Sequence, residues 1–325
     1  MANPAAVSAQ PARATLLAFA GAVLAGGNNA VAIHQTVLEL PPLWAMAARF
    51  IAAGVILAAI ALLTGRSFPR GRSLGGALLY GAIGFAFAFG PISVGLRHVG
   101  GGTGTMLIAI TPLVTFALAV VQGQERFHVR GLIGGLIALG GIGIVFADQL
   151  RADVPLGSLL LVLIGTVSIA ESAIILKGIP RSDPFATNAV AMLAGGGLLL
   201  AASFLAGETH PIPARGETWL ALGYLVVVGS VVLFSLFVYT LQRWTASAVS
   251  YATLLFPFVG LTTATLLVGE SFTPLLVVGG LVALVGVYVG AFYARPQRTS
   301  ATSAPECLPI DACAGSASAP AESPA

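Results

Sequence analysis

Charged residues are scarce in this sequence. Only 8% of its 325 residues are Asp, Glu, Lys or Arg, whereas 57% are hydrophobic and the mean hydropathy is +0.95. Soluble domains carry roughly 25% charged residues, so this chain has too few ionic side chains to cover a surface that faces water. The composition excludes an ordinary soluble protein and indicates that a lipid bilayer surrounds most of the chain.

Lysine and cysteine are also scarce. Lys177 is the only lysine and no basic cluster is interleaved with aromatic residues, so the pI of about 9.1 does not indicate a nucleic-acid partner. The two cysteines, Cys307 and Cys313, both lie near the C-terminus, where they cannot supply a disulfide framework or a tetrahedral metal site for the fold. We therefore expect neither nucleic acid nor metal.

Motifs for nucleotide and hydrolytic chemistry are absent as well. The sequence has no GxxxxGK(S/T), GxSxG, HExxH or CxxC. No paired nucleophile and base stands out among the remaining residues. We expect no ATP hydrolysis, no other enzyme activity and no cofactor.

Ten hydrophobic blocks make up most of the chain, each close to the length of about 20 residues that a helix needs to cross a bilayer. Helices satisfy their own backbone hydrogen bonds in lipid, and short polar or proline-rich breaks separate these blocks. We predict an all-α polytopic membrane protein with ten transmembrane helices. The helices are expected at about 14–33, 42–64, 74–96, 101–121, 130–147, 155–176, 184–206, 217–240, 246–268 and 273–293.

The two ends of the chain differ from the rest. Residues 294–325 are rich in Ala, Ser, Pro and Thr and hold too few aliphatic side chains to offset the entropy of ordering. We predict a disordered tail there and a flexible N-terminus at 1–13. The first hydrophobic block is long enough to span and lacks a convincing small-residue cleavage site, so we expect a retained helix rather than a signal peptide.

Lys and Arg are distributed unequally between alternate loops, and cytoplasmic loops carry the excess in membrane proteins. With the N-terminus inside, eleven basic residues fall on the cytoplasmic side and three on the other. The cytoplasmic set is Arg13, Arg66, Arg70, Arg72, Arg126, Arg130, Lys177, Arg181, Arg243, Arg295 and Arg298, against Arg97, Arg151 and Arg215. We predict that both termini are cytoplasmic.

The second half of the chain repeats the first. Residues 132–141, LIGGLIALGG, match 277–286, VVGGLVALVG, at an offset of 145. The same offset pairs Leu96 with Leu241, Pro112 with Pro257, Glu125 with Glu270 and Phe127 with Phe272. A small change of offset pairs Pro42 with Pro184 and Asn29 with Ser172.

This repeat predicts two five-helix halves, at 14–147 and 148–293. An odd number of spans makes the second copy enter the membrane from the opposite side, which gives an inverted-topology repeat. Secondary transporters use this arrangement, with a solute site at the midplane between the halves. Chance similarity between Gly- and Leu-rich helices does not explain the matched Pro, Glu and Phe residues.

These features resemble the drug/metabolite transporter superfamily, and specifically its EamA-type family, over about residues 14–293. The matching residues are Asn29 with Val31, Ala32 and Ile33; Pro41 and Pro42 with Arg49 and Phe50; Leu96 and Arg97; Pro112; Gly123 to Glu125; Pro257; and Gly269 with Glu270. Where tryptophans are frequent in the family, this sequence has Gly26 and Ile169.

The resemblance implies a ten-helix carrier, usually in the bacterial inner membrane, that moves metabolites such as amino acids or drug-like compounds, often outward. It also implies that helices 1–4 and 6–9 surround a central cavity and that helices 5 and 10 are peripheral.

Two charged residues, Arg49 and Glu171, lie clearly within expected spans, where a charge costs roughly 2.5–3.5 kcal/mol and is usually functional. Arg49 suits a substrate carboxylate, or it snorkels or pairs with helix-end carbonyls. Glu171 suits a cationic group or proton exchange, or it pairs with Lys177 near the membrane interface.

Further candidates for a cavity wall are polar residues within apolar helices. Asn28 and Asn29 can hydrogen-bond either a solute or a neighbouring helix. Thr111, Ser250 and Tyr251 are weaker candidates of the same kind.

Two prolines and two glutamates occupy matched positions. Pro112 and Pro257 remove a backbone hydrogen bond within a span and suit hinges. Glu125 and Glu270 suit gates or helix caps. Gly131 with Gly135, and Gly286 with Gly290, have GxxxG spacing that suits helix packing or a homodimer.

Together these observations predict a proton- or gradient-driven secondary transporter, an exporter of a small metabolite that works by alternating access. The alternative is a membrane receptor or assembly partner that kept the transporter scaffold without transport.

Overall fold

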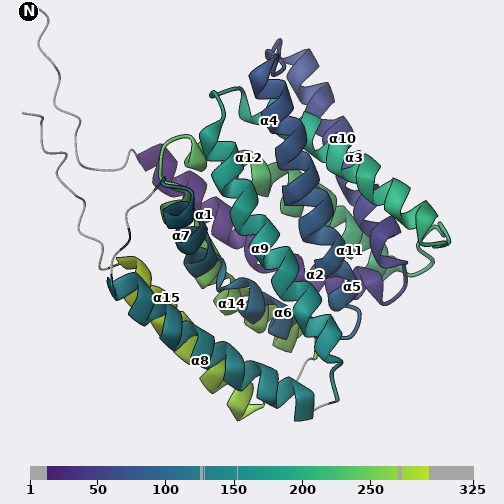
Figure 1. Cartoon of the computed structure of the whole chain (residues 1–325). Helices are drawn as coiled ribbons and strands as arrows, with labels where there is room; N and C mark the ends of the chain where they lie inside the picture. Colours follow the sequence, from purple (N-terminus) through teal and green to yellow (C-terminus); the bar gives the residue numbers. More distant parts are fainter. Residues whose placement is uncertain (1–12, 125–126, 128, 152, 270–272, 293–325) are drawn as a thin grey trace, which may run out of the picture. The chain divides into compact units, whose positions relative to one another are not determined.

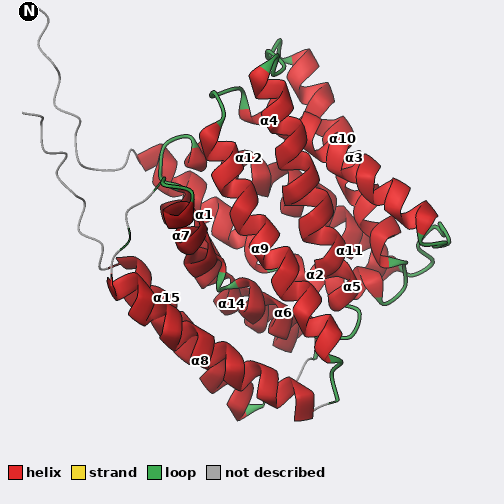
Figure 2. Ribbon diagram, in the orientation of Figure 1, coloured by secondary structure: helices red, strands yellow, loops and turns green. Residues whose placement is uncertain are grey.

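The computed structural model describes residues 13–124, 127, 129–151, 153–269 and 273–292, and all regular structure in these residues is helical (Figures 1 and 2). Glu125, Glu270, both cysteines and the predicted C-terminal tail lie outside the described residues.

The first half contains α1 (Arg13–Gly27), α2 (Asn29–Val37), α3 (Pro42–Leu63), α4 (Arg72–Gly81), the π-helical turn η1 (Ala82–Phe87), α5 (Ala88–Gly95), α6 (Gly101–Ile108), α7 (Thr111–Val121) and α8 (Val129–Arg151). The second half contains α9 (Leu156–Gly178), α10 (Pro184–Leu205), α11 (Gly216–Val226), the π-helical turn η2 (Val227–Val232), α12 (Leu233–Leu241), α13 (Ala246–Ser250), α14 (Ala252–Thr263), the π-helical turn η3 (Ala264–Val268) and α15 (Pro274–Phe292).

Eight helical stretches in the described residues, some with a short break, are long and apolar enough to cross a membrane. They run over Arg13–Val37, Pro42–Leu63, Arg72–Gly95, Gly101–Val121, Leu156–Gly178, Pro184–Leu205, Gly216–Leu241 and Ala246–Leu266. The apolar parts of α8 and α15, Ile133–Asp148 and Pro274–Gly286, are shorter. The ends of the helical stretches lie within four residues of those expected from the sequence.

α3 begins with a proline, and a carboxylate distant in the sequence caps its first turn. Pro42 occupies the first turn, where its missing N–H is not needed. The carboxylate of Glu208 then accepts hydrogen bonds from the backbone N–H groups of Leu43 at 3.2 Å and Trp44 at 2.9 Å. These are orphan donors of the helix start, so Glu208, from the loop after α10, caps a helix of the other half.

Two π-helical turns occupy matched positions in the repeat. Residues 82–87 of η1 and residues 227–232 of η2 are separated by 145 residues, the offset that also relates the matching sequence segments. Such turns are rare and frequently lie at functional sites. The start of α13 at Ala246 follows the start of α6 at Gly101 by the same interval.

Close backbone approach joins α8 to α15, which lie side by side in Figure 1. A Cβ on Gly141 would lie 2.6 Å from the carbonyl oxygen of Gly279, and one on Gly286 would lie 2.7 Å from that of Gly134. Both distances are shorter than a real Cβ contact. The glycines therefore serve packing within the chain at these positions.

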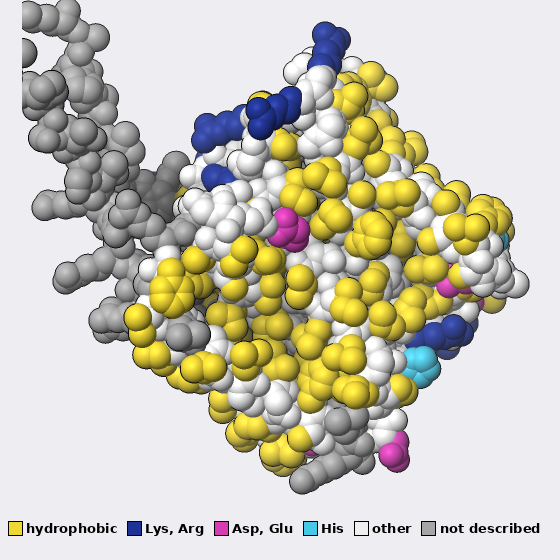
Figure 3. Space-filling model, viewed as in Figure 1, with side chains coloured by type: hydrophobic (Ala, Val, Ile, Leu, Met, Phe, Trp, Pro, Cys, Tyr) yellow, Lys and Arg dark blue, Asp and Glu magenta, His cyan; other side chains and the backbone are white. Residues whose placement is uncertain are grey.

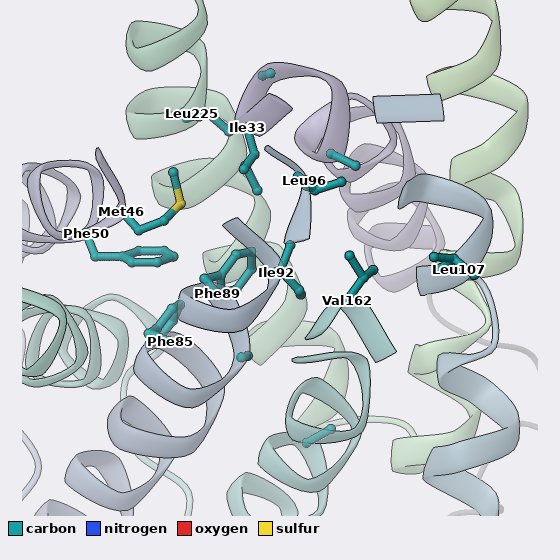
Figure 4. Packing of buried hydrophobic residues seen from close by; sticks show 14 of the residues in the cluster. Ile33, Met46, Phe50, Phe85, Phe89, Ile92, Leu96, Leu107, Val162 and Leu225 are labelled. Carbon is teal, nitrogen blue, oxygen red and sulfur yellow. The ribbon is translucent and has the colours of Figure 1, made fainter. Parts of the chain in front are cut away.

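Aromatic side chains pack together where α3, η1 and α5 meet, as Figure 4 shows for Phe50, Phe85 and Phe89, and Phe234 of α12 adds to them. The ring centroids of Phe50 and Phe85 are 4.8 Å apart, as are those of Phe85 and Phe234, and Phe89 lies 5.1 Å from Phe50. On the outside, Figure 3 shows hydrophobic side chains over most of the visible face and most Lys and Arg side chains at its upper end. This surface matches a lipid environment.

Candidate functional site

A cavity of about 80 Å³ lies between helices of the two halves. The lining comes from α1, α2, α4, η1, α5 and α6 of the first half and from α9, α12 and α14 of the second. The lining residues are Gly26, Asn29, Ala30, Tyr80, Gly84, Phe89, Thr105, Ile108, Ile169, Ser172, Leu233, Phe234, Phe237, Thr253 and Phe256. None of them is charged, so the cavity offers apolar contact and hydrogen bonds but no ionic contact.

Aromatic rings form much of the wall. Phe89 comes from α5, Phe234 and Phe237 from α12, and Phe256 from α14. Ligand sites are commonly apolar and aromatic with a few oriented polar groups, and this lining has that composition. Gly26 and Ile169 also face this cavity, and the small Gly26 leaves room for the Phe256 ring.

Three hydroxyl groups of the lining are already hydrogen-bonded to backbone carbonyls three or four residues earlier in the chain. Thr105 donates to the Gly101 carbonyl at 2.8 Å, and Ser172 donates to the Ile169 carbonyl at 2.7 Å. Thr253 donates to the Ser250 carbonyl in the same way. Their oxygens remain able to accept a hydrogen bond from a bound solute.

Two other polar groups of the lining keep unused hydrogen-bonding capacity. Asn29 Nδ2 donates to the Gly229 carbonyl at 3.3 Å, whereas Asn29 Oδ1 is buried with no partner among the described residues. The buried hydroxyl of Tyr80 also has no partner there. A buried polar group without a partner costs about 1–3 kcal/mol, so a solute that hydrogen-bonds these atoms would relieve that cost.

Arg49 lies next to the cavity but does not line it. Its guanidinium is fully buried, and no described carboxylate pairs with it. Nε donates to Ser230 Oγ and Nη2 donates to the Gly229 carbonyl, both at 2.8 Å. The charge also lies 4.8 Å and 5.1 Å from the ring centroids of Phe50 and Phe89, which stabilises a buried cation through the aromatic quadrupoles.

The other polar candidates do not line the cavity. Asn28 separates α1 from α2 and its Oδ1 is buried without a partner in the described part. The hydroxyl of Thr111, at the start of α7, donates to the Ile108 carbonyl at the end of α6, and that of Ser250 donates to the Ser247 carbonyl within α13. Tyr251, between α13 and α14, packs near Ala138 of α8.

Glu171 does not border the cavity, although the next residue does. Its carboxylate accepts a hydrogen bond from Gln122 Nε2 at 2.7 Å, which joins α9 to the end of α7. Gln124 Nε2 donates to the Ile174 carbonyl at 3.3 Å and adds a second contact between the same elements. Lys177 instead donates to the carbonyls of Leu241 and Trp244 at the end of α12.

The two matched prolines have different local settings. Pro112 lies in the first turn of α7, directly after the break between α6 and α7. Pro257 lies inside α14, six residues after the break at Tyr251. Their spans are thus both interrupted, at positions that do not coincide in the repeat.

Tyr80 and the four phenylalanines are absent from the residues selected on sequence. The local sequence does not show whether an aromatic residue in an apolar span faces lipid, the protein core or a cavity, because its neighbours in the sequence are apolar in all three cases. Ser172 could have been selected from the sequence, because the repeat places it opposite Asn29.

Comparison with known proteins gives a consistent assignment. The EamA-like transporter family matches residues 12–147 and again residues 156–291. An uncharacterized inner membrane transporter, YedA of Escherichia coli K12, is 31% identical over 228 residues, which cover 70% of this chain and 74% of that protein.

Two further relatives have names that state a cargo. A probable amino-acid metabolite efflux pump of Salmonella typhimurium is 26% identical over 292 residues, covering 86% of this chain and 96% of its own length. A probable terminal-alkyne amino-acid exporter of Streptantibioticus cattleyicolor is 28% identical over 242 residues, covering 74% and 80%.

A solved crystal structure shares the fold, with a TM-score of 0.64 at 17% identity, covering 87% of this chain and 98% of the other. The apolar helices and the relatives together identify an integral inner-membrane transporter rather than an enzyme. Because the family matches both halves, and the Escherichia coli transporter matches most of the chain at 31% identity, this chain belongs to the EamA-like transporter family.

Proposed function

We propose that this protein is a secondary transporter that exports a small metabolite, amino-acid-like or drug-like, by alternating access. The observation that carries this proposal is the uncharged, aromatic cavity between the two halves, with unused hydrogen-bonding groups on Asn29 and Tyr80. A solute bound there would contact both halves at once. Movement of one half against the other would then change its exposure to the two sides of the membrane.

The size of the cavity supports a cycle of opening and closing. Its volume of about 80 Å³ is well below the roughly 300–1,000 Å³ typical of small-molecule sites. The described conformation is therefore a contracted one, and the cavity must widen to admit a metabolite.

We propose ten spans arranged as two inverted five-helix repeats, with both termini cytoplasmic. The matched π-helical turns and the two family matches support a duplicated unit. The eight long apolar stretches, together with α8 and α15, supply five helices for each half. The excess of Lys and Arg on alternate loops supports the orientation.

Among the residues selected on sequence, we propose that Asn29 contacts the solute directly. Asn28, Arg49, Thr111, Ser250 and Tyr251 then support the wall from behind. Glu171, next to Ser172 of the lining, is the proposed site for proton coupling. Pro112 and Pro257 are proposed hinges, and Glu125 and Glu270 proposed gates.

The names of the Salmonella and Streptantibioticus relatives favour amino acids and their derivatives as the first compounds to test. The experiment is counterflow in proteoliposomes that contain the purified protein, with a panel of radiolabelled amino acids and uncharged derivatives. Counterflow of at least one compound is the expected result. No counterflow for any compound, in protein with a cooperative unfolding transition, would instead favour a receptor on a transporter scaffold.

A further inference from the structure

Two contacts between the halves are related by the repeat. In each, a residue of the first span of one half lies against a glycine of a π-helical turn of the other half. Asn29 lies against Gly229 of η2, and Ser172 lies against Gly84 of η1. The two glycines are 145 residues apart, and the sequence repeat pairs Asn29 with Ser172.

Neither glycine tolerates a side chain in this arrangement. A Cβ on Gly229 would overlap Asn29 Oδ1, and a Cβ on Gly84 would lie 2.8 Å from the Cβ of Ser172. Asn29, Ser172 and Gly84 all line the central cavity. The paired contacts therefore form part of the wall that must separate when the cavity widens.

The contact of Asn29 with η2 is fixed by hydrogen bonds. The Gly229 carbonyl accepts from Asn29 Nδ2 at 3.3 Å and from Arg49 Nη2 at 2.8 Å. Arg49 also donates to Ser230 Oγ at 2.8 Å. Because the charge is buried and lacks a described carboxylate partner, it depends on these hydrogen bonds and on the Phe50 and Phe89 rings. Separation from η2 would therefore be unfavourable.

In the described residues, no hydrogen bond holds Ser172 to η1. The Ser172 hydroxyl donates within its own helix, to Ile169. The 142-residue separation of Pro42 and Pro184 places Ala191 opposite Arg49 in the repeat. Alanine supplies no donor, and its backbone packs directly on Gly81 before η1.

We infer that Arg49 is a positioning residue that locks η2 against Asn29, so that the cavity opens first at the unlocked contact between Ser172 and Gly84. This inference rests on the proposed function. Asn29 lies towards the outer end of its span and Ser172 towards the inner end of its own, in the proposed orientation. The lock therefore keeps the outer side closed while the empty protein loads from the cytoplasm, as an exporter requires.

A π-helical turn is suited to this role because its hydrogen bonds can shift to the α-helical pattern while the span stays helical. The locked turn η2 resists this shift, since Arg49 contacts two successive residues of it. In the described residues, no hydrogen bond from Ser172 resists this shift in η1. Arg49 thus determines the order of opening through η2 and not by contact with the solute.

The experiment measures access to the cavity from each side of the membrane. Cys307 and Cys313 are replaced by serine in the full-length protein, and Thr105→Cys places one thiol in the cavity lining. Labelling by a membrane-impermeant thiol reagent is then compared in right-side-out and inside-out vesicles. In the variant that retains Arg49, the thiol introduced by Thr105→Cys should react from the cytoplasmic side.

Arg49→Ala should raise labelling from the outer side by about tenfold, the scale expected when hydrogen bonds to a charged group are lost. Arg49→Lys, which keeps a donor, should restore most of the closure. Ser172→Ala is the matched variant and should leave outer labelling unchanged. Outer labelling that stays low in folded Arg49→Ala protein would overturn the inference.

Ser230→Ala provides a second test if Arg49→Ala does not fold. It removes one of the two contacts to η2 and should produce a smaller rise in outer labelling, whereas no rise would contradict the lock. Transport kinetics separate this role from solute binding: Arg49→Ala should affect a carboxylate solute and its amide equally. A rise in KM for the carboxylate solute alone would show instead that Arg49 binds the solute directly. Labelling does not require transport. The labelling experiment therefore still tests the role of Arg49 if no transport activity is found.

Discussion

The carboxylate of Glu39, in the loop between α2 and α3, accepts a hydrogen bond from the hydroxyl of Thr218 in the first turn of α11. The same carboxylate accepts from the backbone N–H groups of Ala214 at 2.5 Å and Arg215 at 3.2 Å. Glu208 makes the reciprocal contact, since it comes from the second half and caps α3 of the first. Two carboxylates thus join the halves at the end of the molecule opposite to the proposed cytoplasmic side.

The Glu39 contact predicts a dependence of stability on pH. The Thr218 hydroxyl, followed by the backbone N–H of Ala214, holds the pKa of Glu39 below its ordinary value of 4.5. A lowered pKa in the folded state adds stability above pH 4.5 that is lost as the pH falls through the folded-state value. The unfolding temperature in detergent should therefore fall more steeply below about pH 4.5 in the wild type than in Glu39→Gln. Equal slopes would show that Glu39 contributes no pH dependence.

Loss of the Glu208 cap should destabilise the folded protein. Glu208→Ala removes the acceptor for the N–H groups of Leu43 and Trp44, and loss of a helix cap costs about 1 kcal/mol. Thermal unfolding in detergent should show a lower midpoint. Glu217→Ala is a suitable control, because Glu217 is exposed in the first turn of α11. An equal decrease in both variants would show that the cap on α3 by Glu208 does not add to stability.

The hydroxyl of Tyr80 should matter for transport and not for stability. It is buried in the cavity lining without a partner in the described residues, so Tyr80→Phe should leave the unfolding temperature unchanged or raise it. If a solute uses this hydroxyl, KM should rise by about tenfold, equivalent to roughly 1.4 kcal/mol. Ser247→Ala also removes a buried hydroxyl that has no partner in the described part of the chain, but Ser247 does not line the cavity. It should change neither KM nor stability; an equal KM change in both variants would contradict the site.

Packing between α8 and α15 should be sensitive to side-chain size at one glycine and not at its neighbour. A Cβ on Gly141 would meet the backbone of α15, whereas one on Gly140 has open space. Gly141→Leu should therefore lower the free energy of unfolding by about 1–3 kcal/mol, the usual cost of overpacking. Gly140→Leu should have a much smaller effect. Comparable losses in the two variants would show that α8 and α15 do not pack in this way.

The positions of the helices were predictable because hydrophobic blocks depend only on local composition. The expected span at 42–64 corresponds to α3, which starts at Pro42 and ends at Leu63. The π-helical turns η1 and η2 were not predictable, because a turn of this kind has no residue signature. Their matched positions become evident only when the helices are compared across the repeat.

The candidate site was predictable in part. The sequence indicates that a charge within a span faces protein or water, so Arg49 could be selected without knowledge of its neighbours. It does not indicate that the acceptors are Ser230 and the Gly229 carbonyl, which come from the other half. Tyr80 was missed because its role depends on which face of the helix borders the cavity. Only the packing of neighbouring spans determines that.

The most direct test of the central proposal, that a solute crosses the membrane through the cavity between the halves, is counterflow in proteoliposomes with the cavity filled. Thr253→Trp places a large ring in the lining, and Thr262→Trp places the same ring on the exposed face of α14. For a solute transported by the wild type, we predict that Thr253→Trp abolishes counterflow in folded protein and that Thr262→Trp retains it. Wild-type counterflow in Thr253→Trp would contradict a route through this cavity.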